Sequence, residues 1–336
     1  MKKVGILFTT RNNYDMLENW LKTFNHEGFP ILNIDENSIE EEKIKGRNIQ
    51  DKYNITHVEG TERGILNNIK TSCKLLQKEG IEWVIWLHHD CWPLTPNFFS
   101  KFNKLANTNK IKDFGLIGFN TLHKCNIQKS YAAKELNYLA RAPLEPGDNW
   151  YRNKKYWGGT RVDLKSGKFD KPFSVQIPAA FGVAVNLKLY DEVIESVSDY
   201  HMMHSWDEIG FQFMYNNIYS LSIPYLHLGH DPSLKTRLGI PAVSVKAHKS
   251  YSHFLQKRLT PKEYDKNLME SDNKYFGKMG NHVLFDRWGI NYDKARKSYE
   301  LVKDKYKGTL LDVYYNHDPI NGPLKSFPDI IYDEDR

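Results

Sequence analysis

Short apolar runs alternate with amphipathic segments along the first third of the chain. The runs are nearly continuous in apolar residues, as expected of strands covered on both faces of a sheet. The expected strands lie at 4–10, 29–35, 54–60, 81–90 and 113–120. Between them, helical spacing or an acidic first turn predicts helices at 14–24, 38–53, 64–80 and 96–107. This alternation predicts an α/β fold with an open, mostly parallel central sheet flanked by helices.

The alternation breaks at 121–175, an aromatic and basic insert rich in Gly, Pro, Trp, Tyr, Lys and Arg. So long an irregular segment with this many aromatic residues indicates a functional loop rather than disorder. Regular patterns return as a strand and helix at 173–197, a helix at 205–218 and a strand at 221–233. Residues 236–336 are rich in Lys and Tyr and predict a helical C-terminal extension.

Composition narrows the class of protein only slightly. The chain has 336 residues, 40% of them hydrophobic, which is typical of a soluble globular protein. Its net charge of +6 fits phosphate-bearing ligands, an anionic membrane surface or nucleic acid, without choosing among them. The three cysteines, Cys73, Cys91 and Cys125, show no CxxC spacing, which argues against a disulfide framework or zinc ribbon and favours a reducing compartment.

Targeting signals are not apparent in the sequence. The first apolar run, 4–8, is too short for a signal peptide, and no run reaches the length of a membrane span. We therefore expect a cytoplasmic protein, with contact to a membrane from the inside as the open alternative.

Polar groups follow three of the expected strands, in the segments "TTRNN", "IDENS" and "HHD". Ligands of open α/β sheets bind beyond the carboxyl ends of the strands, so these groups predict a binding crevice there. Asp90 supplies a carboxylate suited to a divalent cation. An alternative to metal binding is open for His88 and His89, since they alternate along the chain and one could pack in the core while the other hydrogen-bonds the backbone.

Several segments resemble, in order, motifs of glycosyltransferase family 2 and related GT-A enzymes. The segments are "ILFTTRNNYDMLENWLKTF", "LNIDENS", "GTERGILNNIKTSCKLL", "VIWLHHDCWP", "AAFGVAVNLKLYDEV", "SWDEIGFQF" and "ESDNKYFGKMG". His88 and His89 stand where that family has the first two acidic residues of its metal-binding segment. The resemblance implies a GT-A, Rossmann-like fold and transfer of a sugar from a nucleotide sugar.

The resemblance also implies a division of the chain. A GT-A domain would span 1–235, with a donor half at 1–120, the insert at 121–175 and an acceptor half at 176–235. An appendage at 236–336 would pack on this domain.

By the same resemblance, the donor nucleotide would contact the ends of the first strands. Thr10 and Asn12 would lie near the uracil and ribose, Arg11 would face a phosphate, and Asp35 would accept a hydrogen bond from the base. Arg63 would also belong to the donor-binding residues. A plainer alternative is that the "TTRNN" turn caps the following helix through Asn12 or Asn13.

A divalent cation, Mn²⁺ or Mg²⁺, is the implied cofactor, with Asp90, His88 and His230 as ligands. Imidazole beside carboxylate suits Mn²⁺ better than Mg²⁺. His227 and His230 are three residues apart and would point to opposite faces of an extended strand, so only His230 is expected in the crevice. The alternative is that "HLGHDPS" forms an ordinary turn whose polar residues bind no ligand.

The acceptor half would supply the general base. Aligning "SWDEIGFQF" with the family motif puts Glu208 at the base position, with Asp207 beside it, although both carboxylates could simply complement the helix dipole. Aromatic residues would bind the acceptor, and Arg152 and Arg161 would meet its anionic groups. The aromatic candidates are Trp150, Tyr151, Tyr156, Trp157 and Trp206.

The sequence thus predicts an inverting, metal-assisted glycosyltransferase that uses a nucleotide-diphosphate sugar, with UDP favoured, and a glycan or lipid-linked acceptor. Three alternatives remain open. The chain could be a non-catalytic relative that binds nucleotide sugar or glycan. It could glycosylate modified DNA bases, as some phage enzymes do. A nucleotidyltransferase is less favoured because "TTRNNYD" lacks a glycine-rich loop.

Overall fold

The computed structural model describes eleven segments of the chain, and structural statements below concern these. They are 1–36, 38–59, 64–123, 137–138, 171–178, 182–195, 205–231, 234–240, 287–289, 301–316 and 324–331.

The described strands form one 10-stranded sheet in the order β3-β2-β1-β4-β9-β6-β10-β5, with β7 paired to β6 and β8 paired to β10. The strands are β1 Val4–Thr10, β2 Ile31–Asp35, β3 Thr56–Glu59, β4 Trp83–Leu87, β5 Cys91–Pro93, β6 Phe114–His123, β7 Asn137–Tyr138, β8 Phe173–Val175, β9 Gly182–Asn186 and β10 Tyr219–His230. Strands β3, β2, β1 and β4 are parallel neighbours, as are β6 and β10. This confirms the predicted α/β fold with a mostly parallel sheet.

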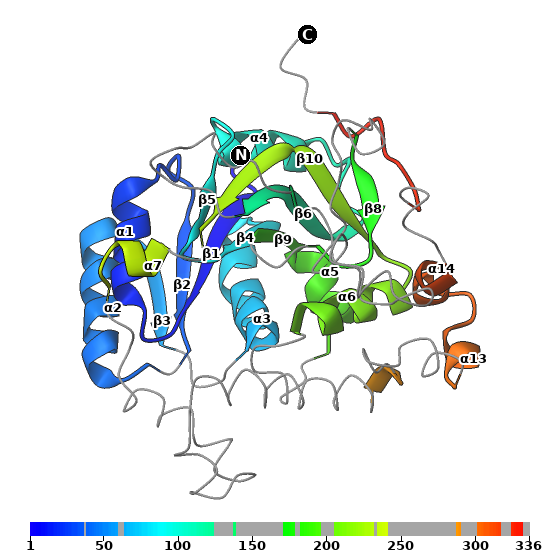
Figure 1. Ribbon diagram of the computed structural model, residues 1–336, viewed down its shortest axis with the longest axis horizontal. Helices are drawn as coiled ribbons and strands as arrows, with labels where there is room; N and C mark the ends of the chain where they lie inside the picture. Colours follow the sequence, from blue (N-terminus) through cyan, green and yellow to red (C-terminus); the bar gives the residue numbers. More distant parts are fainter. Residues whose placement is uncertain are drawn as a thin grey trace, which may run out of the picture.

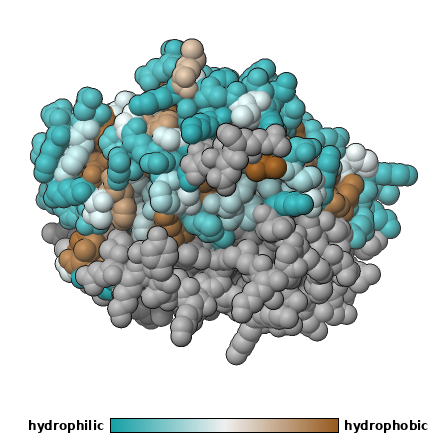
Figure 2. Space-filling view, turned by 90° about the horizontal axis from the view of Figure 1, so that it is seen from above, coloured by the Kyte–Doolittle hydropathy of each residue, from teal (hydrophilic) through white to brown (hydrophobic). Residues whose placement is uncertain are grey.

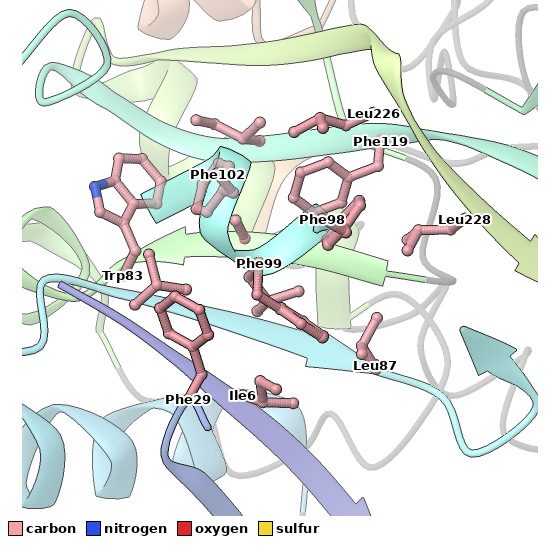
Figure 3. Close-up of a cluster of buried hydrophobic side chains, with 14 of the residues drawn as sticks. Ile6, Phe29, Trp83, Leu87, Phe98, Phe99, Phe102, Phe119, Leu226 and Leu228 are labelled. Carbon is pink, nitrogen blue, oxygen red and sulfur yellow. The ribbon is translucent and has the colours of Figure 1, made fainter. Parts of the chain in front are cut away.

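Helices cover both faces of the sheet (Figure 1). They are α1 Tyr14–Thr23, α2 Glu40–Tyr53, α3 Ile65–Leu76, α4 Phe98–Asn107, α5 Leu187–Val193, α6 Ser205–Tyr215, α7 Leu234–Arg237, α13 Lys303–Tyr306 and α14 Leu310–Asn316. Side chains of β1 alternate between two cores: Leu7 belongs to a core with residues of α3, α5 and α6, whereas Ile6 and Phe8 belong to a core with residues of α1 and α4. Figure 3 shows Ile6 in the second core, with Phe98 and Phe99 of α4. The continuous apolar run of β1 is therefore explained by burial on both faces.

Two features of the sheet differ from the sequence prediction. The pattern at 173–197 predicts one strand, but the structure has β8 on β10 and, separately, β9 between β4 and β6, antiparallel to both. A strand buried on both faces has the same apolar pattern in either direction, so the sequence could not show that β9 reverses. Strand β4 also ends at Leu87, three residues before the predicted end, so "HHD" lies in the loop that leads to β5.

The described C-terminal segments pack against the sheet domain. Helix α14 contacts α6, and Trp288 packs against Phe211 and Tyr215 of α6. Tyr306 packs on Trp288 at a tilt, with ring centroids 6.1 Å apart, and meets Tyr215 edge-on at 6.2 Å. These contacts bury aromatic surface between the end of the chain and the predicted acceptor half.

The described surface in Figure 2 is mostly hydrophilic, with apolar residues in small separate groups. Scattered groups of this kind are normal on soluble domains. None of the helices in the described segments is both long and apolar enough to cross a membrane.

Candidate functional site

Four strands bring their carboxyl ends to one edge of the sheet. Strands β1, β2 and β4 are parallel, and β10 has the same direction because β9 is antiparallel to both β4 and β6 while β6 is parallel to β10. The segments after these strands therefore meet at one edge, as the sequence predicts for a ligand crevice.

His88, Asp90 and His230 meet at this edge and could hold a metal ion. One ligand atom from each lies within 4.8 Å of those of the other two. Asp90 is the centre of the group, with His88 Nδ1 3.7 Å from its Oδ1 and His230 Nε2 3.5 Å from its Oδ2. The Asp90 side chain is 26% exposed, so an ion can reach it. Two imidazole nitrogens and one carboxylate, with further positions open to water or a ligand, can hold a divalent transition-metal ion such as Mn²⁺.

The histidines keep the Asp90 carboxylate ionised. Burial alone would raise the pKa of Asp90, but hydrogen bonds and charge from His230 and His88 outweigh burial and hold the pKa of that carboxyl well below its usual range. An ionised carboxylate is the form that binds a metal, and imidazole binds beside it in its neutral form.

Backbone hydrogen bonds hold the loop that carries His88 and Asp90 next to the end of β10, which carries His230. Asp231 N–H donates to the Asp90 carbonyl at 3.0 Å, and His230 pairs with Cys91 in the β10–β5 ladder. His227 lies away from the group, with its backbone N–H donating to Thr95 Oγ1 at 2.8 Å. Of the two histidines of β10, the structure brings only His230 to the crevice. The Asp231 carboxylate pairs with Arg237.

His89 points away from the metal group, into the sheet. Its ring stacks on Phe8, with centroids 5.5 Å apart, and its Nε2 lies 2.9 Å from Thr10 Oγ1. Burial lowers the pKa of His89 to about 4, against the opposing charge of Asp90, so the ring is neutral. Because Thr10 Oγ1 donates to Asn33 Oδ1 at 2.5 Å, Nε2 of His89 must carry the proton and donate to Thr10.

The chain of hydrogen bonds continues from Asn33 to His57, where Asn33 Nδ2 donates to Nδ1 at 3.0 Å. Thr10 and Asn33 are completely buried. The Thr10 hydroxyl therefore joins the "HHD" loop to β1 and β2, and both of its hydrogen-bonding roles are filled within the chain.

Thr10→Val tests this buried link. Valine keeps the shape of threonine but leaves Asn33 Oδ1 and His89 Nε2 without their partner, which typically costs about 1–3 kcal/mol per buried group. We expect the free energy of unfolding in urea to fall by about that amount. Thr23→Val, which removes an exposed hydroxyl that donates to Asn19 O at 2.7 Å, is the control. Equal stability of the two variants would show that the Thr10 link does not stabilise the fold.

The predicted nucleotide-binding residues join the first two loops. Asn12 has a left-handed backbone, φ 46°; its N–H donates to Ser38 Oγ and its Oδ1 accepts from Ile39 N, both at 2.9 Å. Asp35 is completely buried and accepts from Tyr14 Oη at 2.6 Å and from Ser38 N at 2.8 Å. The capping alternative is not borne out by side-chain bonds: neither α1 nor α2 has a side-chain cap, and Asn12 Oδ1 accepts instead from Ile39 N, just before α2. Asp35 acts within the chain as an anchor of this loop.

The other donor and acceptor predictions fall largely outside the described residues. Arg11 is partly buried in the turn after β1. Outside the described residues lie Arg63, Trp150, Tyr151, Arg152, Tyr156, Trp157 and Arg161. Trp206 is 7% exposed and packs on Trp86, with ring centroids 5.1 Å apart, while Trp86 meets His88 edge-on at 4.7 Å. Trp206 therefore packs behind Trp86, the aromatic residue that contacts His88 of the metal group.

Glu208 lies in a buried ion pair with the C-terminal part of the chain. Its Oε1 accepts from Gln212 Nε2 at 2.8 Å and Arg287 Nε at 2.9 Å, and its Oε2 accepts from Trp288 Nε1 at 2.7 Å. Asp207 is also buried. The carboxylate predicted as the base thus has both oxygens engaged in docking the segment at 287–289 onto α6.

Sequence reasoning missed several of these partners because they are distant in the chain. Arg287 and Trp288 follow Glu208 by about eighty positions, and no local spacing relates them. Lys235, whose Nζ donates to Asn13 Oδ1 at 2.9 Å, stands five positions after His230. A basic residue this close to a predicted metal ligand is a signal that could have found it.

Comparison with known proteins gives likeness in structure only. No protein-family model and no curated protein sequence matches the chain. Solved structures that resemble it include a mannosyltransferase from Pyrobaculum calidifontis in complex with GDP-Man and Mn²⁺ (TM-score 0.43, 12% identity, covering 93% of this chain and 84% of that one). A second is GalNAc-T7 with UDP, GalNAc and Mn²⁺ (TM-score 0.44, 13% identity, covering 90% of this chain and 58% of that one). A third is S. aureus TarS 1–349 in complex with UDP-GlcNAc (TM-score 0.40, 10% identity, covering 93% of this chain and 78% of that one).

All three are glycosyltransferases, the class that the sequence resembles. The likeness is one of fold, and at TM-scores below 0.5 it carries no argument about substrates, which rests on the residues of this chain.

Proposed function

We propose that the protein is a metal-assisted, inverting glycosyltransferase that takes a sugar from a nucleotide-diphosphate sugar, with UDP favoured as the nucleotide. The observation that carries the proposal is the group of His88, Asp90 and His230 at the carboxyl edge of the sheet. Strand β4, which leads to His88 and Asp90, pairs with β1, at whose end the sequence resemblance expects the nucleotide.

The proposed reaction makes a nucleoside diphosphate leave the sugar. A divalent cation held by His88, Asp90 and His230 would neutralise the charge that develops on the departing diphosphate. The chain supplies the fixed positions: Asp90 provides the anionic ligand, and the backbone bond from Asp231 N–H to the Asp90 carbonyl keeps the loop and β10 in register.

We propose Asp207 rather than Glu208 as the general base that takes the proton of the acceptor hydroxyl. A base must be able to accept this proton, and the Glu208 oxygens already accept three hydrogen bonds, one of them from the Arg287 guanidinium. Asp207 adjoins Trp206, which packs on Trp86 next to the metal group. Glu208 instead fixes α6 to the C-terminal segment.

The proposed acceptor is a hydroxyl group of a glycan or a lipid-linked sugar. Support comes from the aromatic residues of the insert at 121–175, because aromatic faces suit pyranose rings. The alternative acceptor is DNA, which a binding assay with duplex DNA at two salt concentrations tests. If the protein binds the duplex and the affinity falls steeply with salt, as release of counterions from the phosphates requires, the acceptor is DNA and the proposed chemistry is unchanged.

Hydrolysis of a panel of nucleotide sugars, with Mn²⁺ and with a chelator, tests the proposed function. We expect slow release of nucleoside diphosphate from one donor in Mn²⁺, and none above background in chelator, because the leaving group then lacks its counterion. Calorimetry of UDP and GDP binding under both conditions gives an independent readout. Nucleotide binding of equal affinity in chelator would contradict the metal site, and absence of binding to any nucleotide would overturn the function.

A further inference from the structure

Helix α7 joins the metal group to the start of α1. Leu234 at its first position packs in a small core with Met16 of α1 and Trp92 of β5. Leu234 N–H donates to the Asp231 carbonyl at 3.0 Å, and Arg237 pairs with the Asp231 carboxylate. These contacts fix α7 beside α1, where Figure 1 shows it.

Lys235 extends from α7 to the turn that follows β1. Its Nζ donates to Asn13 Oδ1 at 2.9 Å, and the contact is half-buried. Burial lowers the pKa of Lys235, and the more distant charges of Glu42 and Asp15 oppose this effect. The ammonium group is thus partly removed from water, and its hydrogen-bond partner among the described residues is a neutral amide oxygen.

The two carboxylates whose charges act on Lys235, those of Glu42 and Asp15, form ion pairs with another lysine. Lys45 Nζ lies 2.9 Å from Asp15 Oδ2 and 2.8 Å from Glu42 Oε1. Within the described segments, no carboxylate forms an ion pair with Lys235. A half-buried ammonium without a contacting anion, at the edge of a crevice, has the properties of an anion-binding group.

We propose that Lys235 is a donor-binding residue whose ammonium group contacts the diphosphate of the nucleotide sugar, between the β1–α1 turn and the metal group. This inference rests on the proposed function. The departing nucleoside diphosphate carries one more negative charge than the nucleotide sugar, and a single divalent cation leaves part of that charge uncompensated. Lys235 supplies the further positive charge, so it binds the departing diphosphate more strongly than the donor.

The test compares Lys235→Met with Lys22→Met by calorimetry in saturating Mn²⁺. Both variants remove one positive charge, but Lys22 lies at the opposite end of α1, in a surface ion pair with Glu18 at 3.2 Å. We expect Lys235→Met to weaken binding of nucleoside diphosphate by about 10-fold to 100-fold, the usual range for loss of a charge-assisted hydrogen bond. Binding of the nucleotide sugar should weaken less, and Lys22→Met should bind both ligands as the parent does.

Two further measurements separate the possible results. Lys235→Arg keeps the charge and should recover most of the affinity, and Mn²⁺ binding without nucleotide should be the same in every variant. If the parent binds nucleotide but Lys235→Met binds it equally well, the inference is wrong and the proposed function stands. If the parent binds no nucleotide, the proposed function itself fails. Loss of affinity in Lys22→Met to the same extent would also overturn the inference, because the effect would then be one of net charge.

Discussion

Asp90→Ala is expected to abolish metal-dependent nucleotide binding and turnover. Asp90 is the only carboxylate of the described metal group and lies within 4 Å of both histidines. Without it, two imidazoles must hold a hard cation that prefers oxygen ligands. We expect Mn²⁺ affinity to fall by more than about 100-fold, beyond the range typical of residues that only support a ligand. Titration of Mn²⁺ followed by electron paramagnetic resonance measures this affinity directly.

The control for this variant is Asp113→Ala, which removes an exposed carboxylate outside the metal group. Asp113→Ala should bind Mn²⁺ as the parent does, and thermal unfolding should show that both variants are folded. His230→Ala should lie between the parent and Asp90→Ala, since it leaves the carboxylate in place. A folded Asp90→Ala protein that still binds Mn²⁺ and nucleotide with parent affinity would place the metal elsewhere.

The donor half of the fold was predictable because its pattern is local. Each of the strands β1, β2 and β4 is a short apolar run, and the helices between them repeat their buried residues at helical spacing. The direction of β9 was not predictable, since the apolar sequence of a strand covered on both faces does not show whether its neighbours run parallel or antiparallel to it. The separation of β8 from β9 depends on pairing with β10, a contact between distant parts of the chain.

The candidate site was predictable to the extent that it follows from strand ends. The sequence places Asp90 and His230 after apolar runs, and parallel strands bring such positions to one edge. The choice of His88 over His89 as a metal ligand did not follow from the strand pattern, because either histidine can face one side of a strand that stops near this point. The structure resolves it through Phe8 and Thr10, which hold His89 in the sheet.

The roles of buried carboxylates were the least predictable part. Asp35 was expected to contact a base, yet its oxygens accept from Tyr14 and Ser38. Glu208 was expected to act as a base, yet it accepts from Arg287 and Trp288, far away in the sequence. In both cases the residue type and the motif position are the same for a catalytic and for a structural carboxylate, and only the tertiary partners distinguish them.

Asp207→Asn and Glu208→Gln are expected to have opposite effects on activity and stability. Asn at 207 keeps the shape of the side chain but cannot take a proton, so turnover should fall by roughly 100-fold to 10,000-fold while donor binding persists. Gln at 208 loses the charge that pairs with Arg287, so the free energy of unfolding should fall by about 1–3 kcal/mol. Turnover of the folded Glu208→Gln protein should remain within about 10-fold of the parent, less than the usual effect of removing a base.

A double-mutant cycle of Glu208→Gln with Arg287→Met distinguishes docking from catalysis. If Glu208 serves to hold the C-terminal segment, each single variant should lower stability and the double variant should lose less than the sum, because the second change removes a partner that the first has already left unpaired. Unfolding in urea gives the stabilities, and nucleotide-sugar turnover at a temperature where all variants are folded gives the activities. Full stability with lost turnover in Glu208→Gln, together with an active Asp207→Asn protein, would return the base to Glu208, where the sequence motif places it, and would leave the ion pair with Arg287 as a contact that opens during the reaction.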